Sequence, residues 1–418
     1  MNSKKSVSAD CCASPGLLSV DDAVNRILSQ ANVISEIESV KTEESLNRIL
    51  AEDILSTINV PGYDNSAMDG YAVRSAEIKS GVTLSVSQRI PAGTVGKPLL
   101  AGTVARIFTG APIPDGADAV VMQERCNDND GLVTINTEIA AGTNLRRAGE
   151  DIAQGGLVLQ TGKKIRPQEM GLLASVGIAE VKVFRRLRVA TFFTGDELVK
   201  PGEPLQSGQI YNSNKYTLTG LLQRFDCEII DLGIVPDTLE DTLTVLKSAA
   251  EQADMVITSG GVSVGEEDYV RIALEQLGEL SMWRVAMKPG KPVAFGKVGN
   301  TLFMGLPGNP VSVFVTFLLF ARPLMLKCQG ANITSQNTLL LKADFDWRAG
   351  ERQEYLRVKI ESREVENGAV ETVAILYPHQ GSGVLSSASW ADGLVEVEIG
   401  RSISKGELVK YLPFEGLI

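Results

Sequence analysis

The sequence lacks the residues from which most transition-metal sites are built. Histidine occurs once in 418 residues, as His379. A single histidine excludes zinc chemistry of the H-E-x-x-H type and any centre with several histidine ligands. The five cysteines are odd in number and include no C-x-x-C pair, which argues against a disulfide framework and a cysteine zinc site.

The sequence also lacks an uninterrupted apolar segment of membrane-spanning length. The longest apolar run, residues 311–326, is broken by Arg322 and Pro323 and falls short of the ~20 residues that cross a bilayer. We expect this run to form a buried helix, and we expect no contact with a membrane. Residues 1–16 contain no apolar core of a signal peptide, so the expected location is cytoplasmic.

An excess of basic residues is the third absence. The chain has 40 Lys and Arg residues against 51 Asp and Glu residues, and its net charge is -11. Nucleic-acid binding requires a basic surface, so we expect no nucleic-acid partner. An anionic ligand would depend on a local positive field made by lysines, arginines and backbone N–H groups.

The N-terminal half divides into segments that differ in composition and in the spacing of their apolar residues. Residues 1–16 are polar and are expected to be disordered. Apolar residues at helical spacing predict a helix over residues 19–32, capped by Ser19, and a second short helix near residues 42–50. Residues 58–148 contain short β-type runs between turn residues, which predict an inserted β domain.

The flanks of this β domain are predicted to form one linker domain. Residues 149–186 contain a helix that begins near Pro167 and ends before Gly177. We expect these residues to join residues 17–57 in a helical linker domain from which the β domain projects.

The C-terminal half predicts two further domains. Residues 187–331 alternate apolar strands with helices of 10–15 residues, which is typical of a three-layer α/β domain with a mostly parallel sheet. Ligands of such sheets bind beyond the carboxyl ends of the strands. Residues 332–418 return to strand-like runs and predict a small β-barrel or sandwich.

Two loops follow strands of the predicted sheet and carry acidic residues. In SGGVSVGEEDY, the N–H groups of Gly260 and Gly261 can hold a phosphate, Ser263 can donate a hydrogen bond, and Asp268 can bind Mg²⁺. In TGDEL, Glu197 follows another strand. Both loops are also consistent with ordinary helix caps and turns. Their convergence at one sheet edge favours a metal–phosphate site.

Two stiff turns add positive charge and further N–H groups. Lys288 and Lys291 belong to the segment KPGKP, in which two prolines and a glycine restrict the backbone. Lone lysines are usually solvated, but a stiff turn reduces the entropy that a lysine loses on binding a ligand. The segment GLPGNP contains Gly308 and Asn309 before a predicted helix that begins at Pro310, and it is a second candidate oxyanion pocket.

Polar turns outside the α/β domain are further candidates. DNSAMDG contains Asp69, FTGAP contains Thr109 and GEDI contains Asp151. Turn formation alone explains such residues, and they name no reaction by themselves. Arg357 and Ser382 add polar groups from the C-terminal region.

Taken in order, these segments resemble the MoeA family of molybdopterin molybdenumtransferases, which includes the E domain of gephyrin. The resemblance covers nearly the whole chain beyond residue 16 and implies a MogA-like α/β domain and a C-terminal β-barrel. It also implies an elongated homodimer in which Asp69 and Thr109 of one subunit face the α/β domain of the other. The segments that carry it are DNSAMDGYAV, RIFTGAPIP, GEDI, TGDEL, SGGVSVGEEDY, MKPGKP and GLPGNP.

The reaction that the resemblance implies is the insertion of molybdate into adenylylated molybdopterin, with release of AMP. Phosphoanhydride cleavage depends mainly on positioning and on charge neutralisation by Mg²⁺. The implied metal ligands are Glu197, Asp237 and Asp268. The implied catalytic residues are Asp69, Thr109, Glu197, Asp237, Asp268, Lys288 and Lys291. The implied substrate-binding residues are Asp151, Gly260, Gly261, Ser263, Arg284, Pro307, Gly308, Asn309, Arg357 and Ser382. Arg284 departs from the lysine expected in similar bacterial sequences, and its planar fork differs from an ammonium.

Two alternatives stay open beside this reading. One is adenylylation of molybdopterin, because a MogA-like domain binds the same pterin; the other is a non-catalytic, gephyrin-like scaffold. The predicted four-domain layout favours molybdate insertion, with transient contact to a MogA-like adenylyltransferase that supplies the substrate. A dinucleotide dehydrogenase is disfavoured because no G-x-G-x-x-G segment opens a helix.

Overall fold

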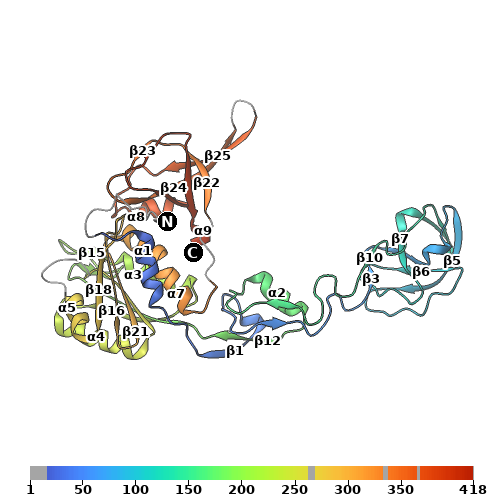
Figure 1. Ribbon diagram of the computed structural model, residues 1–418, viewed down its shortest axis with the longest axis horizontal. Coiled ribbons are helices and arrows are strands. Elements are labelled where there is room, and N and C mark those ends of the chain that lie inside the picture. Colours follow the sequence, from blue (N-terminus) through green and yellow to red (C-terminus); the bar gives the residue numbers. More distant parts are fainter. Residues whose placement is uncertain (1–16, 262–268, 333–337, 365–367, 418) are drawn as a thin grey trace, which may run out of the picture. The chain divides into compact units, whose positions relative to one another are not determined.

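The computed structural model describes residues 17–261, 269–332, 338–364 and 368–417. The chain forms two compact units. Unit 1 comprises Met1–Glu38, Asn47–Ile49 and Val183–Ile418, and unit 2 comprises Ser39–Leu46 and Leu50–Lys182. The chain passes between the units along β1 (Ile37–Lys41) and β12 (Glu180–Phe184), which pair with each other (Figure 1).

A six-stranded sheet forms the centre of unit 1. Its strand order is β16-β13-β17-β21-β20-β18. The first four strands are parallel, and β20 runs antiparallel to both β21 and β18. The predicted, mostly parallel sheet is confirmed. Its strands are β13 (Arg188–Thr194), β16 (Glu228–Val235), β17 (Met255–Ser259), β18 (Glu279–Arg284), β20 (Pro292–Val298) and β21 (Thr301–Leu306).

Helices cover both faces of this sheet, so the domain has three layers. Phe193 packs into one apolar cluster, and its neighbour Phe192 packs into another, because successive strand side chains point to opposite faces. The first face is covered by α1 (Val20–Ser29), α3 (Ser213–Arg224), α6 (Pro310–Thr316), η4 (Phe317–Ala321) and α7 (Arg322–Cys328). The second is covered by α4 (Leu239–Gln252) and α5 (Tyr269–Leu277).

The apolar run that the sequence analysis assigned to a buried helix is the continuous segment α6-η4-α7. Among the described residues, it is the helix long and apolar enough to cross a membrane, but 78% of its apolar window is buried inside the protein. Its five central residues form a π-helical turn. Pro323 follows this turn and has no N–H to donate to the preceding turn of an α-helix. The predicted core helix is confirmed, with this wider turn inside it.

A closed five-stranded β-barrel follows at the C-terminus. The ring order is β24-β25-β22-β28-β26, and pairing of β24 with β26 closes it. Apolar side chains such as Leu356, Val395 and Tyr411 fill its interior. The predicted barrel is therefore confirmed. Its strands are β22 (Leu339–Ala343), β24 (Gln353–Glu364), β25 (Val370–Leu376), β26 (Gly393–Val397) and β28 (Leu408–Pro413).

Short elements complete unit 1. The barrel carries α8 (Leu385–Trp390) and α9 (Phe414–Leu417), two short helices for which the sequence gives no convincing pattern. The remaining strands are β14 (Leu198–Val199), β15 (Ile210–Tyr211), β19 (Met287–Lys288), β23 (Trp347–Arg348) and β27 (Ser402–Ile403). β19 is the strand that joins the two domains, because it leaves the α/β domain and pairs with β24 of the barrel.

Unit 2 contains a β domain and a small helical part, whereas α1, expected in the linker domain, packs on the α/β sheet of unit 1. The β domain is a six-stranded sheet of order β7-β4-β6-β5-β9-β8. Tyr71 and Val73 pack on one face, and Ala72 packs on the other. Its strands are β4 (Gly70–Val73), β5 (Val82–Ile90), β6 (Thr103–Ile107), β7 (Ala119–Met122), β8 (Cys126–Asn129) and β9 (Leu132–Ile135). Two small pairs are β2 (Ile54–Leu55) with β11 (Leu157–Leu159), and β3 (Asn65–Ser66) with β10 (Leu145–Arg146).

The helix predictions for the N-terminal half are confirmed in two of three places. Ser19 caps α1, and its hydroxyl accepts from the N–H of Asp22 at 3.1 Å. Helix α2 (Pro167–Ser175) begins at the expected proline and ends before Gly177, whose φ is 77°. The helix predicted near residues 42–50 was wrong. That segment contains a single 3₁₀ turn, η1 (Thr42–Glu44), because Asn47 adopts a left-handed conformation that ends any helix there.

Candidate active site

The carboxyl ends of the parallel strands bring four loops of unit 1 to one edge of the sheet. β13 ends at Thr194 beside Val235 of β16, and Ser259 of β17 lies beside Leu306 of β21. Glu197, Asp237, Gly260 and Pro307 follow these strand ends. This edge is where doubly wound sheets bind their ligands.

A cavity of about 510 Å³ opens at this edge. It is lined from both the α/β domain and the barrel. The lining residues are Gly260, Gly261, Lys288, Pro289, Gly290, Lys291, Pro292, Pro307, Gly308, Asn309, Ser312, Arg352, Gln380, Gly381 and Ser382. The structure therefore brings together eight predicted site residues, namely Gly260, Gly261, Lys288, Lys291, Pro307, Gly308, Asn309 and Ser382.

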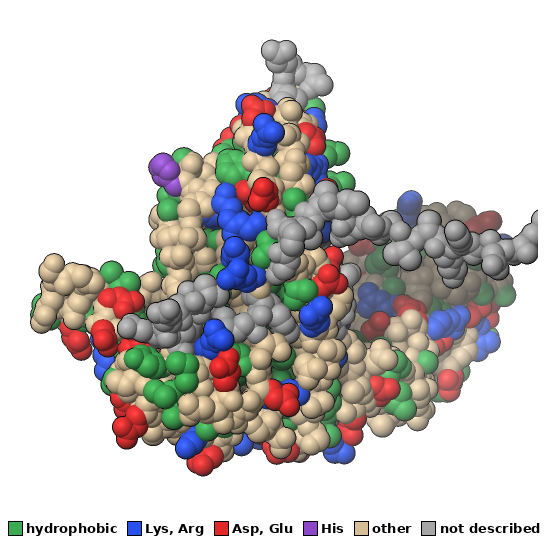
Figure 2. All heavy atoms as spheres, turned by 60° about the vertical axis from the view of Figure 1, so that its left-hand side comes forward, with side chains coloured by type: hydrophobic (Ala, Val, Ile, Leu, Met, Phe, Trp, Pro, Cys, Tyr) green, Lys and Arg blue, Asp and Glu red, His purple; other side chains and the backbone are tan. Residues whose placement is uncertain are grey.

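Among the lining residues that the structure describes, every charged side chain is a cation. These cations are Lys288, Lys291 and Arg352. Figure 2 shows Lys and Arg side chains gathered on the face where the barrel meets the α/β domain. In a protein with a net charge of -11, such a local excess of cations favours an anionic ligand.

Glycine is required where the first loop approaches its neighbours. Gly261 has a φ of 63°, and a Cβ atom there would lie 2.7 Å from Val270 Cγ2 and 2.9 Å from Thr194 Oγ1. Gly260 has a φ of 89°. These two residues keep the loop narrow and leave backbone rather than side chains at the cavity wall, as expected of an anion-binding loop.

Hydrogen bonds close the KPGKP turn and attach it to the barrel. The Val285 N–H donates to the Lys291 carbonyl at 2.9 Å, which closes the turn. The Gln353 N–H of the barrel donates to the Ala286 carbonyl at 2.8 Å. The guanidinium of Arg352 donates to the Met287 carbonyl at 3.2 Å. Lys288 is half-buried and Lys291 is exposed, so the rigid turn presents one partly enclosed lysine and one solvent-exposed lysine.

Arg357 holds the loop that carries Ser382 in place through hydrogen bonds. The guanidinium of Arg357 is buried and donates to Ser387 Oγ at 3.0 Å and to the Gly381 carbonyl at 3.1 Å. The Arg357 N–H also donates to Gln380 Oε1 at 2.9 Å. Burial lowers the pKa of Arg357 to about 10. Arg357 is thus placed in the barrel wall behind the cavity and not among its lining residues.

The two predicted carboxylates of unit 1 that the structure describes lie at the sheet edge but outside the cavity lining. Glu197 and Asp237 are exposed and follow adjacent strands. Asp268 and Ser263 lie outside the described residues. Among the residues that the structure describes, no group of three or more His, Cys, Asp or Glu side chains is arranged to hold a metal ion. Carboxylates on adjacent strand ends have the oxygen chemistry that Mg²⁺ prefers.

Arg284 is not among the residues that line the cavity. It is the last residue of β18, pairs with Pro292 across the sheet and has an exposed side chain. The Arg284 carbonyl accepts from the Leu18 N–H at 2.9 Å. These contacts place Arg284 at the end of an edge strand, beside the lining residue Pro292.

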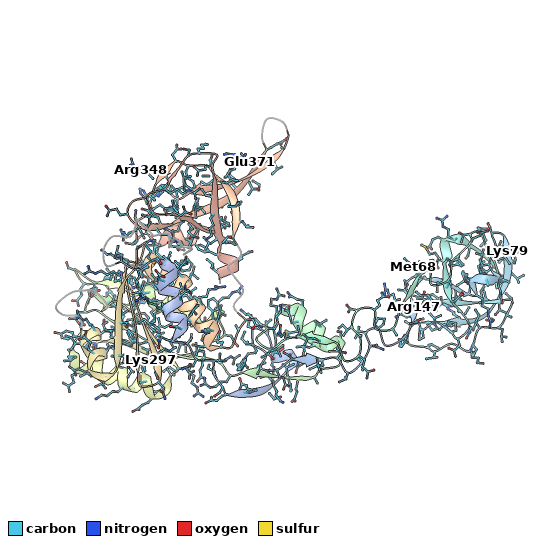
Figure 3. The ribbon with its side chains drawn as sticks, in the orientation of Figure 1. Met68, Lys79, Arg147, Lys297, Arg348 and Glu371 are labelled. Carbon is cyan, nitrogen blue, oxygen red and sulfur yellow. The ribbon has the colours of Figure 1, made fainter. Side chains whose placement is uncertain are left out.

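In unit 2, the structure pairs two of the predicted site residues. Asp69 Oδ1 accepts from both the N–H and the hydroxyl of Thr109, each at 2.8 Å. The backbone bond to Thr109 is the main cause of a lowered pKa of Asp69. Asp151 is exposed. Met68, next to Asp69, and Arg147 lie on one side of the β domain, and Lys79 lies on the opposite side (Figure 3).

Sequence reasoning missed several residues that build the cavity. Arg352 and Ser312 line it, and Asn214 Nδ2 donates to the Gly308 carbonyl at 2.7 Å. Asn214 stands in the N-terminal turn of α3, where an asparagine reads as an ordinary cap residue. Arg352 stands next to a strand of the barrel. Neither residue has a local pattern that points to a ligand.

Comparison with known proteins agrees with this architecture along nearly the whole chain. Residues 18–177 match the MoeA N-terminal region (domain I and II), residues 190–327 match a probable molybdopterin binding domain, and residues 341–414 match the MoeA C-terminal region (domain IV).

Curated relatives and solved structures extend the similarity. The chain is 42% identical over 415 residues to a molybdopterin molybdenumtransferase of Haemophilus influenzae, which covers 96% of this chain and 100% of that protein. It is 40% identical over 328 residues to a protein of the same name from a Nostoc species, covering 75% of this chain and 74% of that protein. A molybdopterin biosynthesis MoeA protein of Pyrococcus horikoshii has a similar structure, with a TM-score of 0.81 at 29% identity over 95% of this chain and 100% of that chain. The chain therefore belongs to the MoeA family.

Proposed function

We propose that this protein is a molybdopterin molybdenumtransferase that inserts molybdate into adenylylated molybdopterin and releases AMP. The observation that carries the proposal is the cavity at the carboxyl edge of the sheet, where the charged side chains among the described lining residues are Lys288, Lys291 and Arg352. Molybdate is a compact oxyanion with two negative charges. Cations and glycine N–H groups around one cavity are the groups that bind such an anion.

The chain's own residues contribute by positioning and by charge neutralisation. Transfer of phosphoryl groups requires little covalent chemistry from the protein and depends on holding the reactants in place. The loop of Gly260 and Gly261 is suited to a phosphate of the pterin nucleotide. The lysines and the neighbouring PGNP loop, in which a Cβ on Gly308 would lie 3.8 Å from Gly260 Cα, are suited to the oxyanion.

The proposal includes a magnesium ion because the carboxylates at the sheet edge are suitable ligands for it. Glu197 and Asp237 follow adjacent parallel strands, and Asp268 follows the strand next to them in sequence order. We propose these three as its ligands. When bound, Mg²⁺ would neutralise charge on the phosphoanhydride.

The second subunit is also part of the proposal. Asp69 and Thr109 form one hydrogen-bonded unit that presents an ionised carboxylate at the surface of the β domain. We propose that a homodimer places this pair opposite the α/β domain of the partner. Location in the cytoplasm and supply of the substrate by a MogA-like adenylyltransferase complete the proposed setting.

Adenylylation of molybdopterin is the weaker candidate. Arg352, Gln380 and Ser382 come from the barrel, and they line the same cavity as the α/β residues. An α/β domain that acted alone would need none of them. The barrel's share in the cavity therefore favours a reaction that the α/β domain does not carry out alone.

A direct assay tests the proposed reaction. Purified protein is mixed with adenylylated molybdopterin and Mg²⁺, and AMP is measured with and without molybdate. We expect AMP release to rise with molybdate concentration and to stop when Mg²⁺ is chelated. Release that is independent of molybdate would contradict the proposal, and formation of adenylylated molybdopterin from ATP would support the alternative.

A further inference from the structure

Glu354 is a buried carboxylate directly behind the cationic wall of the cavity. It stands in β24 of the barrel and is 4% exposed. Its position in the strand is opposite Lys288 of β19, because these two strands pair in parallel. A buried carboxylate is strongly unfavourable unless charges and hydrogen bonds compensate it. Its partners therefore indicate why it is there.

The carboxylate of Glu354 accepts hydrogen bonds from three donors. Glu354 Oε2 accepts from the indole N–H of Trp347 at 3.1 Å. Glu354 Oε1 accepts from the Gly350 N–H and from the ammonium of Lys288, each at 3.3 Å. Indole and backbone donors fix the carboxylate in one orientation, and the carboxylate in turn fixes the ammonium.

Lys288 reaches from this partner to the cavity. Its side chain remains 41% exposed, and it contributes to the cavity wall. Its ammonium also lies 5.9 Å from the centre of the Trp347 ring. A free lysine side chain loses up to about 2 kcal/mol of rotamer entropy when it is ordered. In this site the ordering takes place before any ligand binds.

We propose that Glu354 is a positioning residue that holds the Lys288 ammonium in place for the oxyanion. The proposal rests on the proposed function, because it assigns Lys288 to molybdate. Glu354 has two opposing effects. Its negative charge offsets part of the attraction between Lys288 and an anion, and its hydrogen bonds keep the ammonium where the reacting anion needs it. Glu354 therefore favours turnover over ground-state binding.

This balance predicts a split between binding and turnover. Glu354→Gln keeps the size of the side chain and removes the charge. We expect molybdate to bind E354Q at least as tightly as wild type, while kcat for AMP release falls about tenfold because the ammonium is no longer fixed. Loss of packing alone would weaken binding and turnover together.

A double-mutant cycle with Lys288→Ala isolates the mechanism. We expect E354Q to change kcat by less than about twofold when Lys288 is already absent, because the residue on which it acts is gone. Glu371→Gln is the matched control. It removes the carboxylate partner of another barrel lysine, Lys342, and Glu371 lies on the far side of the barrel from Arg348, the neighbour of Trp347 (Figure 3).

Calorimetry with molybdate alone, the AMP assay and Tm are measured for every variant. An equal loss of kcat from E354Q in both backgrounds overturns the proposal, as does a loss explained by the unfolded fraction. Wild type that binds molybdate but releases no AMP in response refutes the proposed function. In that case the cycle of molybdate affinities still decides the Glu354 proposal, because an interaction between the two positions supports it and additivity overturns it.

Discussion

Gly290 is the position at which the structure makes the sharpest stability prediction. It lies in the KPGKP turn, is buried and has a φ of 107°, which L side chains rarely adopt. A Cβ atom there would lie 2.4 Å from Thr316 Cγ2 in the core helix. Gly290→Ala therefore introduces both backbone strain and a steric overlap.

The two contributions can be estimated separately. A residue in a sparsely populated backbone region costs about 1–3 kcal/mol. Overpacking in a dense core costs about 1–3 kcal/mol more. We expect G290A to lower the free energy of unfolding of unit 1 by about 2–6 kcal/mol.

Thr316→Ser distinguishes the steric overlap from the backbone strain. This change removes the methyl group that meets the new Cβ and keeps the hydroxyl, which donates to the Ser312 carbonyl at 2.6 Å. Alone, T316S should cost about 0.5–1.5 kcal/mol for a lost buried methyl group. The double variant should be more stable than the sum of the single effects by the overlap term of about 1–3 kcal/mol.

Urea unfolding followed by tryptophan fluorescence measures these energies. The three tryptophans, Trp283, Trp347 and Trp390, all belong to unit 1, so the signal reports that unit. Strictly additive effects of G290A and T316S would refute the steric part of the reasoning. A G290A protein as stable as wild type would refute both parts.

Three further predictions concern the site. Asp268→Asn should lose most turnover in the AMP assay with an unchanged Tm, because the proposed Mg²⁺ ligand is lost, and unchanged turnover would refute that role. Lys291→Ala should weaken molybdate binding in calorimetry, more at low salt than at high salt, and an effect independent of salt would exclude a direct charge contact. Thr109→Ala should raise the pKa of Asp69 toward its usual value, seen by NMR titration of labelled aspartate carboxyls, because one of two hydrogen bonds is removed. Since the folded-state pKa of Asp69 is lowered, its stabilising contribution is present above the usual aspartate pKa and is lost as pH falls through the lowered value; T109A should reduce that acid sensitivity.

The sequence allowed the secondary structure of the α/β domain to be predicted closely. The runs that become β13 and β17 are mostly apolar because strands covered on both faces bury side chains in both directions. Local turn chemistry likewise predicted the start of α2 at Pro167. It failed near residues 42–50, where the left-handed backbone of Asn47 overrides apolar spacing.

The sequence predicted only part of the cavity, because only some of its residues depend on local backbone shape. Glycine loops and the KPGKP turn are visible in the sequence because their function depends on local backbone shape. Arg357 looked like an anion-binding residue, and only the folded barrel shows its guanidinium enclosed behind the cavity wall. Arg352, five positions earlier in the chain, lines the cavity instead.

By itself, the sequence determined the class of the α/β domain and of the C-terminal barrel and many of the loops that surround the site, because periodicity and turn preferences are local properties. Tertiary structure alone decided which charges meet. Glu354 and Lys288 are 66 residues apart, and neither shows a sign of the other in the sequence. They come within hydrogen-bonding distance because β19 crosses to the barrel and pairs with β24. Burial of Glu354 at that crossing then requires a partner for its charge, and Lys288 supplies one.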